Sequence, residues 1–178
     1  MNGSHPIRPA TPEQILSARA YALAAEEVRA DDADHLAVLA FGLGKETYGI
    51  ELRYAGGVHP LKDVSYIPGV PDFILGIINM RGKILSVVDL KKTFGLGADA
   101  SGNRKLVILL ENTEMEFGLA ADSIIGVIRI SLDEITTSLP TLTGIRSDYL
   151  LGISGDGTVI LDGHKLLYAP EMRIDIGS

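Results

Sequence analysis

The sequence predicts a mainly β protein that is built from two small β-subdomains. From Leu36 onward, short apolar or alternating runs recur at hairpin spacing, broken by Gly, Pro, Asn and Asp, which gives nine or ten strands. This rhythm is typical of a barrel or a sandwich and not of alternating β–α units. In addition, residues 73–77 resemble residues 149–153, and a Gly-bearing turn and a strand ending in Asp follow each of them. This faint internal repeat indicates two related subdomains.

The strands follow from local patterns along the chain. In the second expected strand, for example, Tyr48, Ile50 and Leu52 alternate and therefore share one face. The expected strands are 36–41, 47–52, 76–80, 83–90, 105–111, 116–121, 124–130, 149–153 and 158–162. Three short helical pieces are expected at 91–94, 131–134 and 163–168.

Residues 1–35 are expected to form an N-terminal extension with an α-helix at about 12–30. Thr11 is a good N-cap, Pro12 suits the first helical position, and Gln14 completes a capping box. The extension has neither a basic region nor an apolar core of the kind found in export signals. Whether this helix packs on its own protein or binds a partner remains open, and partial disorder is a third alternative.

Composition excludes several classes of function. The 178 residues include no cysteine, so disulfides, thiolate nucleophiles and cysteine metal sites are impossible. The net charge of −7 argues against nucleic-acid binding and against an anionic membrane surface. The longest apolar stretches have about 8 residues, whereas a membrane span needs roughly 20. We therefore expect a cytoplasmic protein with no direct membrane insertion.

The chain carries no convincing catalytic motif. The Gly-Leu-Gly-Lys run that ends at Lys45 lacks two features of a phosphate-binding loop, because Leu39 and Glu46 occupy the required Gly and Ser/Thr positions. The four histidines are scattered, and no pair has metal-ligand spacing. Asp89 and Asp162 end strands in both repeat units, where capping is favoured over a hydrolytic carboxylate dyad. We expect no catalytic residues, no cofactor and no metal site, so the protein is not expected to be an enzyme.

The most distinctive stretch covers residues 67–94. Pro68 and Pro71 stiffen a loop, and Gly76 lets another backbone approach closely. Residues 79–82, Asn-Met-Arg-Gly, form a tight polar turn between two strands.

This stretch resembles the CheW-like family, the coupling proteins of bacterial chemotaxis. The family pattern reads I-P-x-x-P-x-F-x-x-G-[VI]-x-N-L-R-G-x-x-[VIL]-P-V-x-D-L, and residues 67–90 follow it closely. The runs at 117–124 and 149–152 resemble two later family stretches. The resemblance covers about residues 36–168.

The resemblance implies two five-stranded β-barrels packed side by side within a domain at 36–172. On this basis the first barrel covers about 45–100, and the second covers about 104–170 together with the strand at 36–42. The N-terminal helix and the short helical turns complete the expected fold.

The resemblance also implies a non-catalytic scaffold that couples chemoreceptors to a histidine kinase within membrane-associated receptor arrays. Its partners are the cytoplasmic tip of the receptor, held in the groove between the barrels, and the regulatory domain of the kinase. The receptor-facing positions carried over are Val58, Asn79, Met80, Arg81 and Gly82. The kinase-facing positions are Ile67, Pro68, Val70 and Pro71. These positions have structural alternatives: a core strand residue for Val58, a plain turn for Asn79 and Gly82, a solvated surface charge for Arg81, and a stiff connector for the proline loop.

Two departures from the family pattern affect the receptor-facing part. The Glu that usually pairs with the Arg of the turn falls on Gly57, and Ser86 replaces a proline. The neighbouring Gly56 and Gly57 weaken a strand and indicate a bulge or a bend. An alternative function is therefore a divergent interaction module that binds another signalling partner, through its N-terminal helix.

Overall fold

The computed structural model describes residues 34–95, 104–137 and 148–173, and these contain ten β-strands, as the strand rhythm predicts. The expected helix at 12–30 lies outside the described residues. The strands are β1 (His35–Leu43), β2 (Glu46–Glu51), β3 (Ala55–Pro60), β4 (Ile74–Met80), β5 (Lys83–Val88), β6 (Leu106–Glu111), β7 (Glu116–Ala121), β8 (Ser123–Ser131), β9 (Leu150–Ile153) and β10 (Val159–Leu161). Short helical elements connect them, namely η1 (Leu52–Tyr54), α2 (Leu90–Thr93), η3 (Leu132–Glu134), α4 (Gly163–Tyr168) and η4 (Pro170–Met172).

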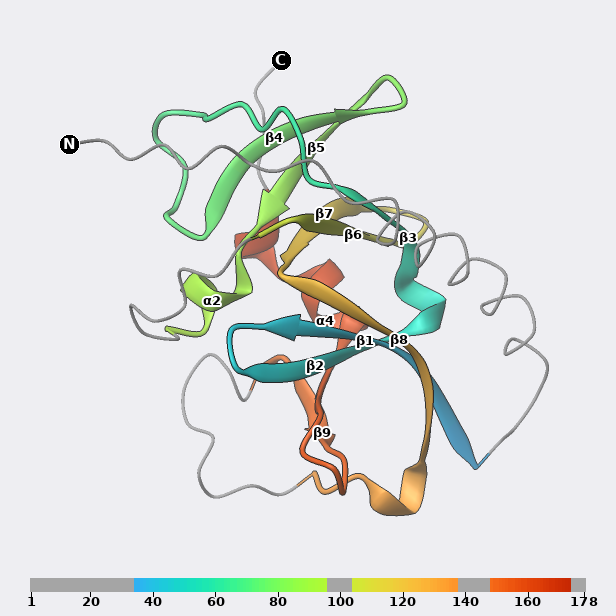
Figure 1. The fold of residues 1–178 in the computed structure, drawn as a ribbon. Helices are drawn as coiled ribbons and strands as arrows, with labels where there is room; N and C mark the ends of the chain where they lie inside the picture. Colours follow the sequence, from blue (N-terminus) through green and yellow to red (C-terminus); the bar gives the residue numbers. More distant parts are fainter. Residues whose placement is uncertain (1–33, 96–103, 138–147, 174–178) are drawn as a thin grey trace.

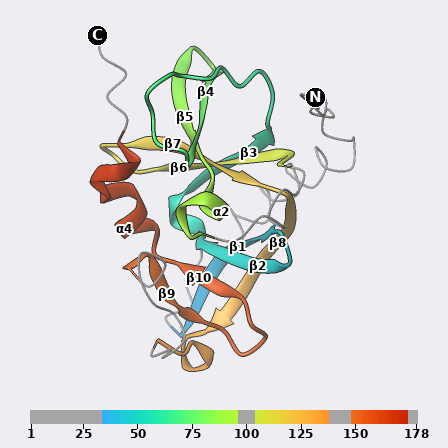
Figure 2. The ribbon, with the colours of Figure 1, turned by 90° about the vertical axis from the view of Figure 1, so that its left-hand side faces the viewer.

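The strands form two sheets of five. One sheet has the order β8-β1-β2-β10-β9, and the other has the order β3-β6-β7-β5-β4. We call them sheet A and sheet B. Figures 1 and 2 show sheet B above sheet A, with α2 at their junction and α4 along one side.

The two sheets are topologically equivalent, and each takes strands from both halves of the chain. The β1–β2 hairpin of sheet A corresponds to the β6–β7 hairpin of sheet B, and β9–β10 corresponds to β4–β5. The central contact is parallel in both sheets, between β10 and β2 and between β5 and β7. The predicted internal repeat is therefore present, but its hairpins are exchanged between the halves of the chain. The β1–β2 hairpin of the first half joins β9–β10 of the second half in sheet A, and the β6–β7 hairpin of the second half joins β4–β5 of the first half in sheet B. The expected division at 45–100 and 104–170 does not follow the sheets, because β2 lies in sheet A and β6–β7 lie in sheet B.

Neither sheet closes into a barrel, which corrects the expected barrel architecture. In sheet B, β3 and β4 remain edge strands. The segment after β3 reaches across and forms a two-bond bridge from Ser65 to Ile77, with both N···O distances at 2.8 Å. Asp63, at φ 53°, turns the chain away from further pairing, and Pro60 has no N–H to donate. A connecting segment thus covers part of the seam that a closed barrel would seal with strand pairing.

A shared hydrophobic core joins the two sheets. It contains large side chains from sheet A such as Phe41 and Tyr48 and from sheet B such as Phe117. Phe94, just after α2, stacks between Tyr48 and Tyr149, at centroid distances of 6.2 and 6.5 Å. Each sheet also has a smaller core on its other face. The two sheets therefore depend on one common interior for most of their burial.

The strand β3 is absent from the predicted strands, because its sequence contains two glycines and a proline. The structure explains these residues. The register of β3 against β6 shifts between Ala55 and Gly57, which is the bulge that the paired glycines predict. A Cβ on Gly56 would lie 2.5 Å from the carboxyl carbon of Glu111. The glycines thus let β3 bend and run close to its neighbour.

Asp89 and Asp162 are helix N-caps, as the capping interpretation predicts. The Asp89 carboxylate accepts a hydrogen bond from Lys91 N at 3.0 Å, and Asp162 accepts one from Lys165 N at 3.1 Å. Asp89 also pairs with Arg104. These equivalent caps start α2 and α4 at the same place in the two repeat units, so neither carboxylate needs a catalytic explanation.

Candidate partner-binding site

The β4–β5 hairpin ends in a tight two-residue turn. Met80 pairs with Lys83, and the two residues between them, Arg81 and Gly82, have φ values of 53° and 81°. Positive φ at both positions is the signature of a type I′ turn, whose twist matches that of a hairpin. The Asn79 side-chain oxygen accepts a hydrogen bond from Gly82 N at 3.1 Å. This geometry confirms the predicted polar turn and leaves the Arg81 side chain exposed.

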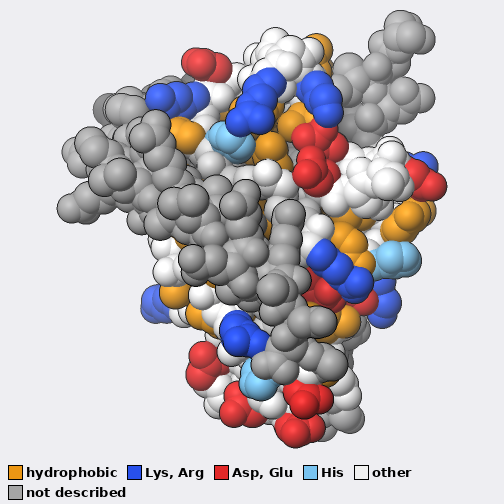
Figure 3. Space-filling model, turned by 90° about the vertical axis from the view of Figure 1, so that its right-hand side faces the viewer, with side chains coloured by type: hydrophobic (Ala, Val, Ile, Leu, Met, Phe, Trp, Pro, Cys, Tyr) orange, Lys and Arg blue, Asp and Glu red, His pale blue; other side chains and the backbone are white. Residues whose placement is uncertain are grey.

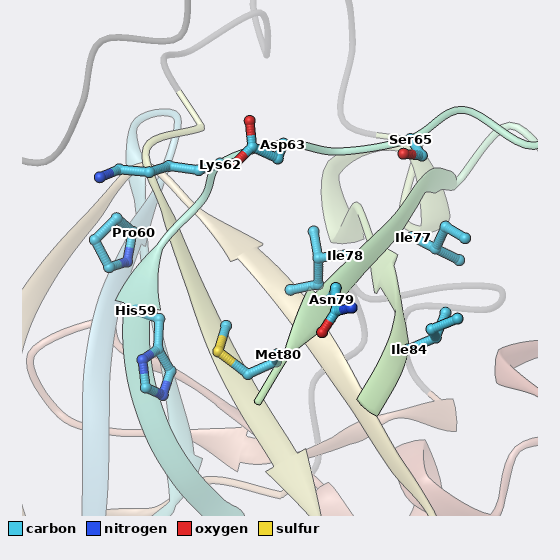
Figure 4. A pocket seen from close by; sticks show the side chains of 10 residues that line it. All are labelled: His59, Pro60, Lys62, Asp63, Ser65, Ile77, Ile78, Asn79, Met80 and Ile84. Atoms are coloured by element: carbon cyan, nitrogen blue, oxygen red, sulfur yellow. The ribbon is translucent and has the colours of Figure 1, made fainter. Parts of the chain in front are cut away.

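A cavity of about 500 Å³ lies beside this hairpin, at the open seam of sheet B. One wall comes from the end of β3, one from β4 and β5, and the roof from the segment that connects β3 to β4 (Figure 4). The lining residues are His59, Pro60, Lys62, Asp63, Ser65, Ile77, Ile78, Asn79, Met80 and Ile84. Half of these residues are apolar, and among them Ile84 is 57% exposed. The cavity exists because the two edge strands do not pair.

The structure brings together some of the predicted receptor-facing residues and separates another from them. Asn79 and Met80 line the cavity, and the exposed Arg81 and Gly82 follow directly in the turn. Val58 does not lie there. Its side chain is 7% exposed and belongs to the core between the sheets, so the core interpretation of Val58 holds.

His59 is the cavity residue that the sequence analysis missed. Side chains alternate along a strand, so the residue after a buried Val58 points to the opposite face. His59 accordingly lies toward the smaller core of sheet B, since its register partner on β6 is Val107. In Figure 4 its imidazole faces the Met80 side chain across the cavity. No local pattern could have found it, because Gly56, Gly57 and Pro60 interrupt the alternation around Val58.

The electrostatics of His59 reflect this position. Burial at the cavity rim lowers the pKa of its imidazole from the ordinary value of 6.5, and the neighbouring Arg81 guanidinium lowers it further. Both effects disfavour the imidazolium form. His59 and Arg81 are therefore close enough to interact, although they lie on β3 and in the β4–β5 turn.

The predicted kinase-facing residues lie in the segment between β3 and β4. Pro68 and Pro71 are exposed, Ile67 is half-buried, and Val70 packs partly against the core between the sheets. The same segment presents Tyr66, whose side chain is 74% exposed. Sequence reasoning did not single out this tyrosine.

Gly76 secures this segment against β4, as the predicted close approach requires. A Cβ on Gly76 would lie 2.3 Å from the carbonyl oxygen of Ser65, and the residue has φ 149°. The register of β4 against β5 also shifts between Ile74 and Gly76. The bulge and the missing side chain let Ser65 pair with Ile77.

The face toward which the hairpin points combines positive and apolar side chains. In the upper part of Figure 3, Lys and Arg side chains and a histidine lie beside exposed hydrophobic ones, with Asp or Glu side chains next to some of the cations. Within the described ranges, no group of three or more His, Asp or Glu residues is arranged to hold a metal ion. No helix in the same ranges has the length and apolarity to span a membrane.

Comparisons with known proteins agree with this description. A family profile described as "CheW-like domain" matches residues 37–171, which is most of the chain. The chain belongs to the CheW-like family. The Treponema pallidum protein named "Chemotaxis protein CheW" is 31% identical over 143 residues, covering 76% of this chain and 84% of that protein. The protein of the same name from Thermotoga maritima is 27% identical over 139 residues, covering 78% and 87%.

A solved structure is similar as well. The crystal structure of the scaffolding protein TtCheW from Thermoanaerobacter tengcongensis matches with a TM-score of 0.64 and 34% identity, covering 78% of this chain and 97% of that chain. The residues that match the family profile, 37–171, contain the hairpin site and nearly all of both sheets.

Proposed function

We propose that this protein is a chemotaxis coupling scaffold that links chemoreceptors to a histidine kinase and catalyses no reaction itself. The observation that carries the proposal is the CheW-like domain over residues 37–171. Similar proteins are named for chemotaxis, and one with a solved structure is named a scaffolding protein. The site chemistry agrees, because an aliphatic cavity with a cationic rim suits the recognition of a protein surface.

The receptor-binding surface in this proposal is the hairpin end of sheet B. It comprises Asn79, Met80, Arg81 and Gly82, together with His59 from β3. The partner is the cytoplasmic tip of a chemoreceptor, a helical hairpin that docks in helix-in-groove fashion. Val58 is left out of this surface because it is buried.

The kinase-binding surface in this proposal is the segment that carries Ile67, Pro68, Val70 and Pro71. Its exposed Tyr66 is a suitable anchor, because aromatic side chains dominate the energy of many interfaces. The two surfaces are adjacent, since this segment pairs with β4 through Ser65 and Ile77. A cytoplasmic protein with both surfaces would be recruited to receptor arrays by its partners.

The test is calorimetric titration of the purified protein with the receptor tip and with the kinase regulatory domain from the same cell. Binding to both is expected. Arg81→Glu should weaken receptor binding at least about tenfold and leave the melting temperature and kinase binding unchanged, because Arg81 is an exposed turn residue. Binding to neither partner would refute the proposal, and a partner captured only in the presence of residues 1–34 would favour the divergent-module alternative.

A further inference from the structure

The rim of the cavity in sheet B carries two exposed cations that form no ion pair with a described residue. Arg81 and Lys62 are exposed, and neither has an ion-pair partner within the described residues. Asp63 is the one carboxylate among the residues that line the cavity. By contrast, Lys83 beside the same turn pairs with Glu116 at 3.1 Å. The turn therefore holds one cation that is paired, Lys83, and one, Arg81, that pairs with no carboxylate of the described residues.

Gly57 explains why β3 supplies no carboxylate to Arg81. Residues 57 and 59 share one face of β3, the face toward the cavity. A Cβ at position 57 would lie 3.1 Å from His59 Nε2, so the imidazole occupies the space into which a side chain at position 57 would extend. β3 thus offers Arg81 a neutral imidazole as its neighbour.

A partner that covers this rim must compensate Arg81. Desolvating an unpaired guanidinium costs binding free energy, whereas a carboxylate placed against it restores the lost interaction. Ile78 and Met80 share the face of β4 that lies toward His59, and they favour an apolar side chain beside that carboxylate. The complementary occupant therefore has a bulky apolar residue next to an Asp or Glu on one surface.

We infer that the partner docking at this hairpin contributes a carboxylate that lies against Arg81 and His59, next to an apolar side chain that enters the cavity, and that binding takes up a proton at His59. This inference rests on the proposed function, in which the partner is the receptor tip. An acidic group brought next to His59 stabilises its imidazolium form, which the free protein disfavours. The affinity therefore increases as the pH falls through the titration range of the histidine.

The other charges around His59 are consistent with this direction. Lys62 and Asp63 in the connecting segment have opposite signs, and both are exposed. Lys83 on β5 is paired with Glu116. On β6 the register partner of His59 is the apolar Val107. Arg81 is thus the neighbour whose charge a partner carboxylate would offset.

The experiment is calorimetric titration of the full chain with the receptor tip, below and above pH 6.5, in two buffers of different ionisation enthalpy. The wild-type protein is expected to bind more tightly at the lower pH with net proton uptake. His59→Gln should abolish the proton uptake, and Arg81→Gln should weaken binding by about tenfold. Asn79→Asp keeps an acceptor for Gly82 N and places a carboxylate beside the rim, where it would compete with the partner carboxylate for Arg81. A similar loss of affinity for the receptor tip is therefore expected. Lys45→Gln, in the exposed β1–β2 turn, is the matched control and should bind as the wild type does.

Single Asp→Asn and Glu→Gln changes on the receptor tip identify the partner carboxylate. One of them should weaken binding to the wild type about tenfold and leave binding to Arg81→Gln unchanged, which is the signature of a direct pair. Equal binding by all variants without proton uptake would overturn the inference and leave the proposed function intact. A tip that does not bind the wild type at all would overturn both.

Discussion

At the scale of single residues, Lys91 is a buried cation that connects the two sheets. Its side chain is 1% exposed, and its ammonium nitrogen lies 2.7 and 3.0 Å from the two carboxylate oxygens of Asp122. Asp122 also accepts a hydrogen bond from Gly44 N at 2.7 Å, in the β1–β2 turn of sheet A. Lys91 follows β5 of sheet B, so this one carboxylate joins groups from both sheets.

Lys91→Met should lower the free energy of unfolding by about 3–5 kcal/mol, because it leaves the Asp122 carboxylate without its cation. Chemical denaturation followed by circular dichroism measures the change. Lys83→Met is the control, since Lys83 pairs with Glu116 at an exposed site and should cost less than about 1 kcal/mol. Equal stability of the two variants would show that the buried pair contributes little.

His59 should make stability depend on pH. The pKa of its imidazole is lower in the folded protein than its ordinary value of 6.5, because of burial and Arg81. The unfolded chain therefore binds a proton at a higher pH than the folded protein does. The stabilisation from a neutral His59 is present above pH 6.5 and is lost as the pH falls from there toward the lower folded pKa. His59→Gln should flatten the stability profile in this window, and an unchanged profile would contradict the assignment.

At the scale of elements, β4 carries both proposed binding surfaces. Its hairpin end presents the turn at Arg81, and its outer edge holds the connecting segment through Ile77. Gly76 serves both surfaces, because the backbone of β4 bulges there and the connecting segment approaches β4 closely at the same residue. The geometry of the cavity therefore depends on one glycine.

Gly76→Ala should destabilise the protein by about 2 kcal/mol or more, because φ 149° is unfavourable for alanine and Ser65 O lies where the Cβ would be. Thermal melting checks this. Gly155→Ala is the control, because a Cβ there would meet no atom within 4 Å. A Gly76→Ala variant as stable as the control would mean that the segment can move away without cost.

At the scale of the whole molecule, the exchanged hairpins make the two halves of the chain interdependent. Sheet A combines β1–β2 with β8–β10, and sheet B combines β3–β5 with β6–β7. The main core also takes its side chains from both sheets. We therefore expect the described part of the chain to unfold in one cooperative transition.

Fragments 34–103 and 104–173 should each be largely unfolded alone, because each lacks strands that its sheets need. An equimolar mixture should regain β structure and a cooperative melt by circular dichroism. A single fragment that melts cooperatively by itself would show that its strands can pair in another way. The fragment pair thus tests the exchanged topology directly.

The sequence by itself determined the local structure and the family. The alternation around Tyr48, the turn at Arg81 and the caps at Asp89 and Asp162 depend on neighbouring residues, so local patterns were sufficient to predict them. The pattern over residues 67–90 likewise predicted the family. The strand β3 was missed because its two glycines and Pro60 obscure a strand pattern, and its pairing partner β6 is distant in the sequence.

Only the tertiary structure decided how these pieces combine. Pairing of β2 with β10 and of β3 with β6 joins residues that are far apart along the chain, so no local pattern specifies them. The same pairing sets which face of β3 is buried, and it places Val58 in the core and His59 at the cavity rim. The edges of sheet B stay open because Pro60 and Asp63 stop further pairing, and that opening makes the candidate site.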